Sequence, residues 1–147
     1  MENHSTTLCR IVYEISYTCD ETLIRMCARE VMKQERLYGG VTVVFVSGLK
    51  MQKMNKQFRG VDSVTDILSF PSQQNTQGAL YLGEIVLCPQ GFRIEKGRSE
   101  EWEVLHLVAH GMFHLLGRHH EHKGDGYEEI HNDEVAIIDR VMKVRSK

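Results

Sequence analysis

The stretch SEEWEVLHLVAHGMFHLLG, residues 99–117, predicts the helix around which the rest of the chain is organised. Ser99 is a favourable N-cap residue, and the two glutamates that follow suit the positive end of the helix dipole. Gly117 is placed to end the helix. Between these ends the segment is apolar on nearly all sides, and a helix of that kind is buried. We therefore expect it at the centre of the fold.

The segments on either side of this helix alternate between the two-residue period of a strand and the 3.6-residue period of a helix. Strand patterns occupy residues 8–15, 41–46, 66–70 and 80–88, and helix patterns occupy 20–37, 49–58 and 127–144. Residues 41–46 are largely β-branched, which is typical of a strand covered on both faces. The polar residues 72–78 predict a loop. Helices that alternate with strands indicate a single α/β domain over residues 1–147, built on one small sheet.

The composition excludes several classes of protein. The chain has 147 residues, of which 41% are hydrophobic and 26% charged, so it is neither disordered nor long enough for two large domains. Its net charge of −2 excludes binding to nucleic acid through bulk positive charge. The four cysteines contain no C-x-x-C pair and are expected to be reduced. No signal peptide and no run of about 18 apolar residues is present, so we expect a cytoplasmic protein without a membrane span.

Three histidines, His106, His110 and His114, recur every four residues and share one face of the predicted helix. They cannot all bind one ion, because the rise from His106 to His114 is about 12 Å whereas a zinc–nitrogen bond is about 2.0–2.1 Å. The helix therefore offers one adjacent pair, and a third ligand has to come from elsewhere. His106 is then expected to be a core histidine whose ring is hydrogen-bonded, or a residue that supports one of the metal ligands.

A turn after the helix brings further histidines within reach. The glycine that ends the helix lets the chain fold back, which gives the spacing H-x-x-x-H-x-x-G-x-x-H with His110, His114 and His120 as ligands. His119 and His122 are rivals for the third place. Three neutral imidazoles leave the fourth position of a tetrahedral zinc open for water, which indicates a catalytic rather than a structural site.

The same histidine spacing occurs in metzincin proteases, which carry a glutamate directly after the first histidine as the general base. In this chain that position is Gly111, which cannot accept a proton. A zincin-like metalloprotease is therefore an unfavoured alternative.

A second group of candidate residues lies in the predicted helix at 49–58 and just after it. The buried stripe of this helix is expected to consist of Met51, Met54 and Phe58. Three lysines point away from it, each an ordinary solvated side chain and together a modest phosphate-steering patch: Lys50, Lys53 and Lys56. Asn55 and Arg59 flank the stripe, so we expect both to be partly covered and Arg59 to be held rigidly as a functional group.

These motifs together resemble the YbeY family of zinc-dependent endoribonucleases. The resemblance rests on HGxxHLxGxxH from His110, on N-x-x-x-R-x-x-x-x-x-TD-[VI]-LSFP from Asn55, and on LG-[DE]-I over residues 82–85. It implies a small mixed sheet surrounded by helices with the metal-binding helix at its centre. It also implies one Zn²⁺ per chain on His110, His114 and His120, with Arg59 as the catalytic arginine.

The resemblance further implies a single-strand-specific endoribonuclease that matures the 3′ end of small-subunit (16S) rRNA and acts in ribosome quality control. Its partners would be ribosomal RNA and the small subunit or its associated proteins. The chain departs from the family pattern at Arg118 and His119, where Tyr-Asp is usual, at Glu84, where Asp is commoner, and at Phe58, where Tyr is commoner. The alternative is a ribosome-assembly binding protein with a structural zinc. The sequence leaves open whether a metal-bound water or the ribose 2′-hydroxyl is the nucleophile.

Overall fold

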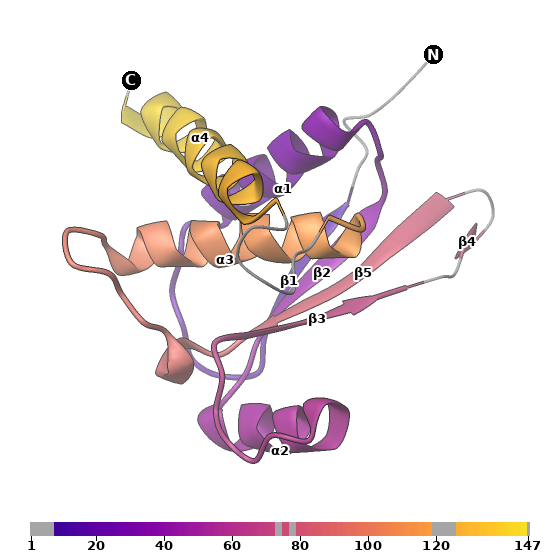
Figure 1. Cartoon of the computed structure of the whole chain (residues 1–147), viewed down its shortest axis with the longest axis vertical. Helices are drawn as coiled ribbons and strands as arrows, with labels where there is room; N and C mark the ends of the chain where they lie inside the picture. Colours follow the sequence, from indigo (N-terminus) through magenta and orange to yellow (C-terminus); the bar gives the residue numbers. More distant parts are fainter. Residues whose placement is uncertain (1–7, 73–74, 77–78, 119–125, 147) are drawn as a thin grey trace.

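A computed structural model describes residues 8–72, 75–76, 79–118 and 126–146 (Figure 1). The elements in chain order are β1 (Cys9–Tyr13), α1 (Glu21–Glu35), β2 (Gly40–Phe45), α2 (Gly48–Arg59), β3 (Ile67–Pro71), β4 (Asn75–Thr76), β5 (Ala79–Leu87), the 3₁₀ helix η2 (Pro89–Gly91), α3 (Glu100–Leu115) and α4 (Tyr127–Ser146). The predicted helices and principal strands are confirmed, with boundaries that shift by at most two residues.

The strands form one mixed sheet in the order β1-β2-β5-β3. β2 runs parallel to both β1 and β5, whereas β3 runs antiparallel to β5. The prediction of an unstructured loop over residues 72–78 is wrong in part, because β4 pairs Asn75 with Leu80 and Thr76 with Ala79. Some backbone N–H and C=O groups of this polar segment are thus hydrogen-bonded within a short hairpin rather than to water.

Side chains cap the N-termini of α1 and α3, and the cap of α3 is the predicted Ser99. The Ser99 hydroxyl accepts a hydrogen bond from the Trp102 N–H at 3.0 Å, and the Asp20 carboxylate accepts one from the Leu23 N–H at 3.2 Å. After α3 the chain turns at Gly117, whose φ of +89° is strained for other residues. These signals fix where α1 and α3 begin and where α3 stops.

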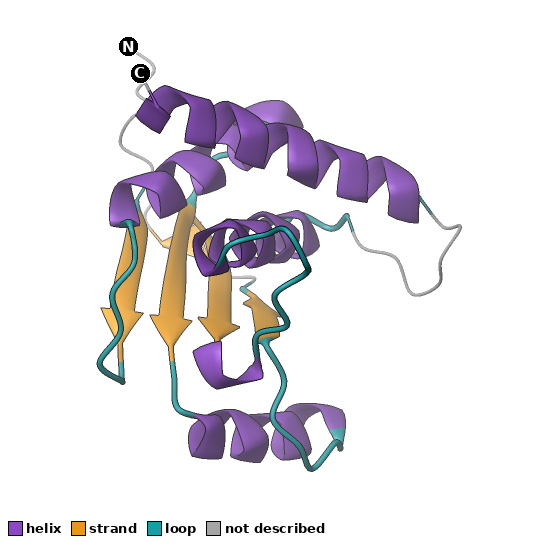
Figure 2. Cartoon of the chain, turned by 90° about the vertical axis from the view of Figure 1, so that its left-hand side faces the viewer, coloured by secondary structure: helices purple, strands orange, loops and turns teal. Residues whose placement is uncertain are grey.

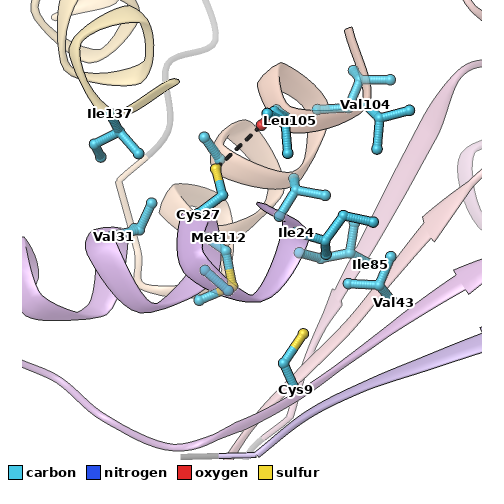
Figure 3. Packing of buried hydrophobic residues seen from close by; sticks show 14 of the residues in the cluster. Cys9, Ile24, Cys27, Val31, Val43, Ile85, Val104, Leu105, Met112 and Ile137 are labelled. Atoms are coloured by element: carbon cyan, nitrogen blue, oxygen red, sulfur yellow. Dashed lines mark hydrogen bonds between the residues drawn. The ribbon is translucent and has the colours of Figure 1, made fainter. Parts of the chain in front are cut away.

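α1 and α3 cover one face of the sheet, α4 packs on these two helices, and α2 lies apart from all three (Figures 1 and 2). The main core joins α1, α3 and α4 to residues such as Val43 and Ile85, which are fully buried (Figure 3). α2 packs on the opposite face against a smaller cluster made of Val46, Met51, Leu68, Val86 and Cys88. The predicted α/β fold with a buried helix at its centre is confirmed.

The four cysteines Cys9, Cys19, Cys27 and Cys88 are free, as the sequence predicts. Cys27 lies on α1 and is fully buried against α3, where its thiol donates a hydrogen bond to the Leu105 carbonyl at 3.4 Å (Figure 3). Across the described ranges, no helix combines the length and the apolar character that a membrane crossing requires.

Candidate functional site

The described part of α3 presents His110 and His114 to a cleft. Their ring centroids lie 4.6 Å apart with the planes tilted by 55°. The cleft has a volume of about 620 Å³ and brings together α2, β3 and α3; its lining residues are Phe58, Arg59, Ile67, Leu68, Ser69, Phe70, His110 and His114. The cleft therefore holds both candidate ligands and the candidate catalytic arginine. Arg59 precedes His110 by 51 residues in the sequence.

The last turn of α2 departs from the sequence prediction. Met51 is fully buried, but Phe58 is 56% exposed, so its place in the buried stripe is wrong. Arg59 is also exposed rather than partly covered. The physical reason is that the second cluster, on which α2 packs, includes Met51 but not the last turn of the helix, which borders the cleft instead. There Phe58 stacks edge-on against Phe70, with ring centroids 5.0 Å apart.

Two other predictions for α2 have different outcomes. Asn55 is buried, not partly covered, and its Nδ2 donates a hydrogen bond to the Ser63 carbonyl at 3.0 Å, so it orders the loop after α2. Lys50 forms an ion pair at 2.6 Å with Glu14, the residue after β1, away from the cleft. Among the described residues, Arg59 has no ion pair and is the cation that lines the cleft.

The third metal ligand lies outside the described residues. His120 and its rivals His119 and His122 all fall in the range 119–125, so the structure gives them no position. The chain before them is anchored by Arg118, whose guanidinium lies 3.1 Å from Glu35 of α1 and 2.9 Å from Asp133 of α4. Arg118 therefore ties the end of α3 to both neighbouring helices.

Sequence reasoning missed Glu134 of α4, a carboxylate that is only 2% exposed. Its Oε2 lies 2.8 Å from Nδ1 of His110, and its Oε1 lies 2.9 Å from Nε2 of His106. A signal for it exists in the sequence. Glu134 lies four residues after Ile130 and three before Ile137, both of which are buried, so it occupies the apolar face of α4. A carboxylate on such a face needs partners.

The charges in this cluster stabilise one another. Burial by itself raises the pKa of Glu134, but hydrogen bonds from His106 and His110 outweigh it and hold that pKa well below its usual value. Burial likewise lowers the pKa of His106, and the neighbouring carboxylates of Glu103 and Glu134 outweigh it and raise that pKa. Glu103 acts as a nearby charge, because its 3.8 Å distance from Nδ1 of His106 is too long for a hydrogen bond.

Two sets of side chains in the described ranges have the donor chemistry of a metal site. The ligand atoms of His106, His131 and Glu134 lie within 4.8 Å of one another, so this group could hold a metal ion. However, two of those atoms are already paired by the 2.9 Å bond between His106 and Glu134. The imidazoles of His110 and His114 instead line the cleft, where a metal would have an open coordination position.

Gly111 lies on a different side of α3 from the histidines. A Cβ atom at this position would lie 3.0 Å from Cδ1 and Cγ1 of Ile85, a fully buried residue of β5. A glutamate in the place used by metzincin proteases would therefore point into the sheet rather than into the cleft. Position 111 is therefore unsuited to a metzincin general base by its orientation as well as by its residue type.

Comparison with known proteins supports the resemblance drawn from the motifs. The family model described as endoribonuclease YbeY matches residues 7–142. A YbeY endoribonuclease from Pelotomaculum thermopropionicum is 37% identical over 135 residues, which cover 84% of this chain and 87% of the relative. One from Thermodesulfovibrio yellowstonii is 42% identical over 85 residues, which span about half of each protein, 55% of this chain and 54% of the relative.

The fold also matches a solved structure. A solution structure from Thermotoga maritima superposes with a TM-score of 0.63 at 30% sequence identity, covering 95% of this chain and 93% of that one. The match thus extends over nearly the whole length of both proteins. Together with the family model, these similarities show that the chain belongs to the YbeY endoribonuclease family.

Proposed function

We propose that this protein is a zinc-dependent endoribonuclease that cleaves single-stranded RNA, acting as one domain over residues 1–147. The observation that supports it best is the shared cleft of Arg59, His110 and His114. One Zn²⁺ per chain would be held by His110, His114 and His120. Bound there, zinc would supply a Lewis acid for a phosphate oxygen and a means of activating water.

The residues of the chain itself divide the remaining work. Arg59 is exposed on the cleft wall and unpaired with any described acid, so its planar guanidinium is available for a bidentate contact to phosphate. The charge that develops on the phosphoryl oxygens in the transition state would be stabilised by this contact. Either a metal-bound water or the ribose 2′-hydroxyl is the nucleophile in this arrangement.

The exposed ring of Phe58 supports a preference for single strands. With Phe70 it forms an aromatic surface at the cleft, on which an unpaired base can stack. A base held in a duplex already uses both its faces and is unavailable for such contact. The specific substrate we propose is the 3′ end of 16S rRNA, processed on or near the small subunit in the cytoplasm, with a further role in ribosome quality control.

A structural zinc and a catalytic zinc make different demands on the site. A structural zinc in a ribosome-assembly binding protein is usually enclosed by four protein ligands. The side chain of His110 is 28% exposed and borders an open cleft, which favours a catalytic centre.

The test combines metal analysis with cleavage of matched RNAs. Purified protein containing one zinc is incubated with a single-stranded RNA and with the same sequence in a duplex, and we expect cleavage of the single strand. Arg59→Ala should keep its zinc and lose about 10²–10³-fold in cleavage rate, the typical effect of removing one donor to a developing charge. Arg59→Lys should restore little of this rate, because a point charge lacks the two-pronged geometry.

Lys53→Ala serves as the matched control, because Lys53 is an exposed cation on the same helix that does not line the cleft. At saturating RNA it should cleave as the wild type does, because a lysine of the predicted steering patch would contribute to affinity and not to the rate of the bound complex. A zinc-loaded wild-type protein that binds single-stranded RNA without cleaving it would contradict the enzyme proposal and favour the binding protein. Unchanged cleavage by Arg59→Ala would remove Arg59 from the mechanism.

A further inference from the structure

The carboxylate of Glu134 connects two helices through two histidines. It lies on α4, whereas His106 and His110 lie one turn apart on α3, and each of its oxygens is within 2.9 Å of a different imidazole nitrogen. Because a carboxylate only accepts hydrogen bonds, Nδ1 of His110 must be the donor in the 2.8 Å contact. This bond determines which nitrogen of His110 carries the proton.

The tautomer matters because a neutral imidazole has one nitrogen free for a metal and one that bears hydrogen. A hydrogen bond from the protonated nitrogen to a carboxylate fixes both the tautomer and the ring orientation and makes the free nitrogen a better ligand. In neutral His110 the nitrogen that carries no hydrogen is then Nε2, and the ring borders the cleft shared with His114. Glu134 therefore sets the tautomer of His110 before any metal binds.

We propose that Glu134 is the positioning residue of the metal centre, holding His110 through Nδ1 so that Nε2 is presented to the cleft. The inference rests on the proposed function in one respect, namely that His110 is a metal ligand. It assigns to α4 a role that neither the histidine motif nor the arginine motif contains.

The position of Glu134 itself is fixed from the other side. Its second oxygen accepts from Nε2 of His106, and the His106 ring is stacked on Trp102, with centroids 5.0 Å apart and planes 23° apart. His106 cannot reach the same ion as His114, so its place in the row of histidines is explained by this support. Trp102, His106, Glu134 and His110 thus form a continuous series of contacts that ends at the cleft.

A second carboxylate offers a matched control. Glu103 is as buried as Glu134, at 6% and 2% exposure, and its Oε1 lies 3.8 Å from His106. It makes no described contact with His110. Glu103→Gln therefore removes a buried charge from the same cluster and leaves the His110 tautomer unaffected.

The experiment measures zinc affinity without RNA, by competition with a chromophoric chelator, in Glu134→Gln, Glu103→Gln and the wild type. We expect Glu134→Gln to weaken zinc binding about 10- to 100-fold, the usual effect of losing such a partner. Glu103→Gln should bind zinc as the wild type does. Nitrogen-15 NMR of the zinc-free wild type should show His110 protonated on Nδ1, and Glu134→Gln should show a mixture of tautomers.

Wild-type zinc affinity in a folded Glu134→Gln, or a wild-type His110 protonated on Nε2, would overturn the proposal. The NMR measurement on the wild type decides it even if the variant does not fold. Loss of zinc in His131→Ala together with its retention in His114→Ala would also overturn it, because the metal would then bind the group containing Glu134. A protein that shows the expected zinc affinities yet cleaves no RNA would refute the proposed function alone.

Discussion

Substituting Gly111 by glutamate tests which way this side of α3 faces. The added Cβ would lie 3.0–3.1 Å from three carbon atoms of Ile85, a fully buried residue that has little space to move. Overpacking of this kind costs about 1–3 kcal/mol. Burying the carboxyl group without a partner adds about 1–3 kcal/mol. After a gain of up to about 1 kcal/mol in helix propensity, we expect Gly111→Glu to lower the free energy of unfolding by about 1–5 kcal/mol.

The measurement is urea unfolding of the zinc-free protein, followed by circular dichroism. Gly111→Ala separates the two costs, because it adds the Cβ without the carboxyl group; its overpacking cost, less a gain of up to about 1 kcal/mol in helix propensity, leaves a net loss of about 0–2 kcal/mol. Combining Gly111→Ala with Ile85→Val removes one of the three close carbons. The double variant should therefore lose less stability than the sum of the single variants.

If residue 111 faced the cleft instead of Ile85, the change in the free energy of unfolding would have the opposite sign. If residue 111 faced the cleft, as the metzincin pattern requires, glutamate would be solvated and would stabilise the helix by roughly 0.5–1 kcal/mol relative to glycine. A Gly111→Glu protein as stable as the wild type would therefore refute the assigned orientation. Appearance of zinc-dependent peptidase activity in that variant would do the same, since we expect none in either form.

Three further perturbations follow from the same structure. Removing zinc with a chelator should abolish RNA cleavage and leave the helical signal intact, because apolar residues of α1, α3 and α4 form the core; unfolding on chelation would indicate a structural zinc. Phe58→Leu should weaken binding of single-stranded RNA by about 1–3 kcal/mol in a filter-binding assay with zinc content unchanged, and equal affinity would exclude base stacking on this ring. In alkylation followed by mass spectrometry, Cys19 should react first but slowly, because burial raises the pKa of its thiol. The other three cysteines are buried and should react only on unfolding: Cys9, Cys27 and Cys88. Early labelling of Cys27 would contradict the packing of α1 on α3.

Sequence reasoning succeeded where a residue acts through its near neighbours along the chain. Ser99 caps α3 through the next turn, and the spacing of His110 and His114 places them on one face because of helix geometry alone. It failed where the outcome depends on how much of an element is covered. Phe58 follows the apolar period of α2, but the packing ends before its turn. Glu134 was missed because its partner is 24 residues away in the sequence.

The bond between α3 and α4 also has a consequence for how the protein is made. A ribosome releases His110 before Glu134, and at about 5–20 residues per second the 24 residues between them take roughly 1–5 s to synthesise. During that interval a nascent chain carries His110 and His114 without the carboxylate that orients the first of them. If Glu134 positions His110 as we propose, the protein would reach its full metal affinity only when α4 has docked, and an incomplete chain would bind zinc poorly and cleave little of the RNA around it.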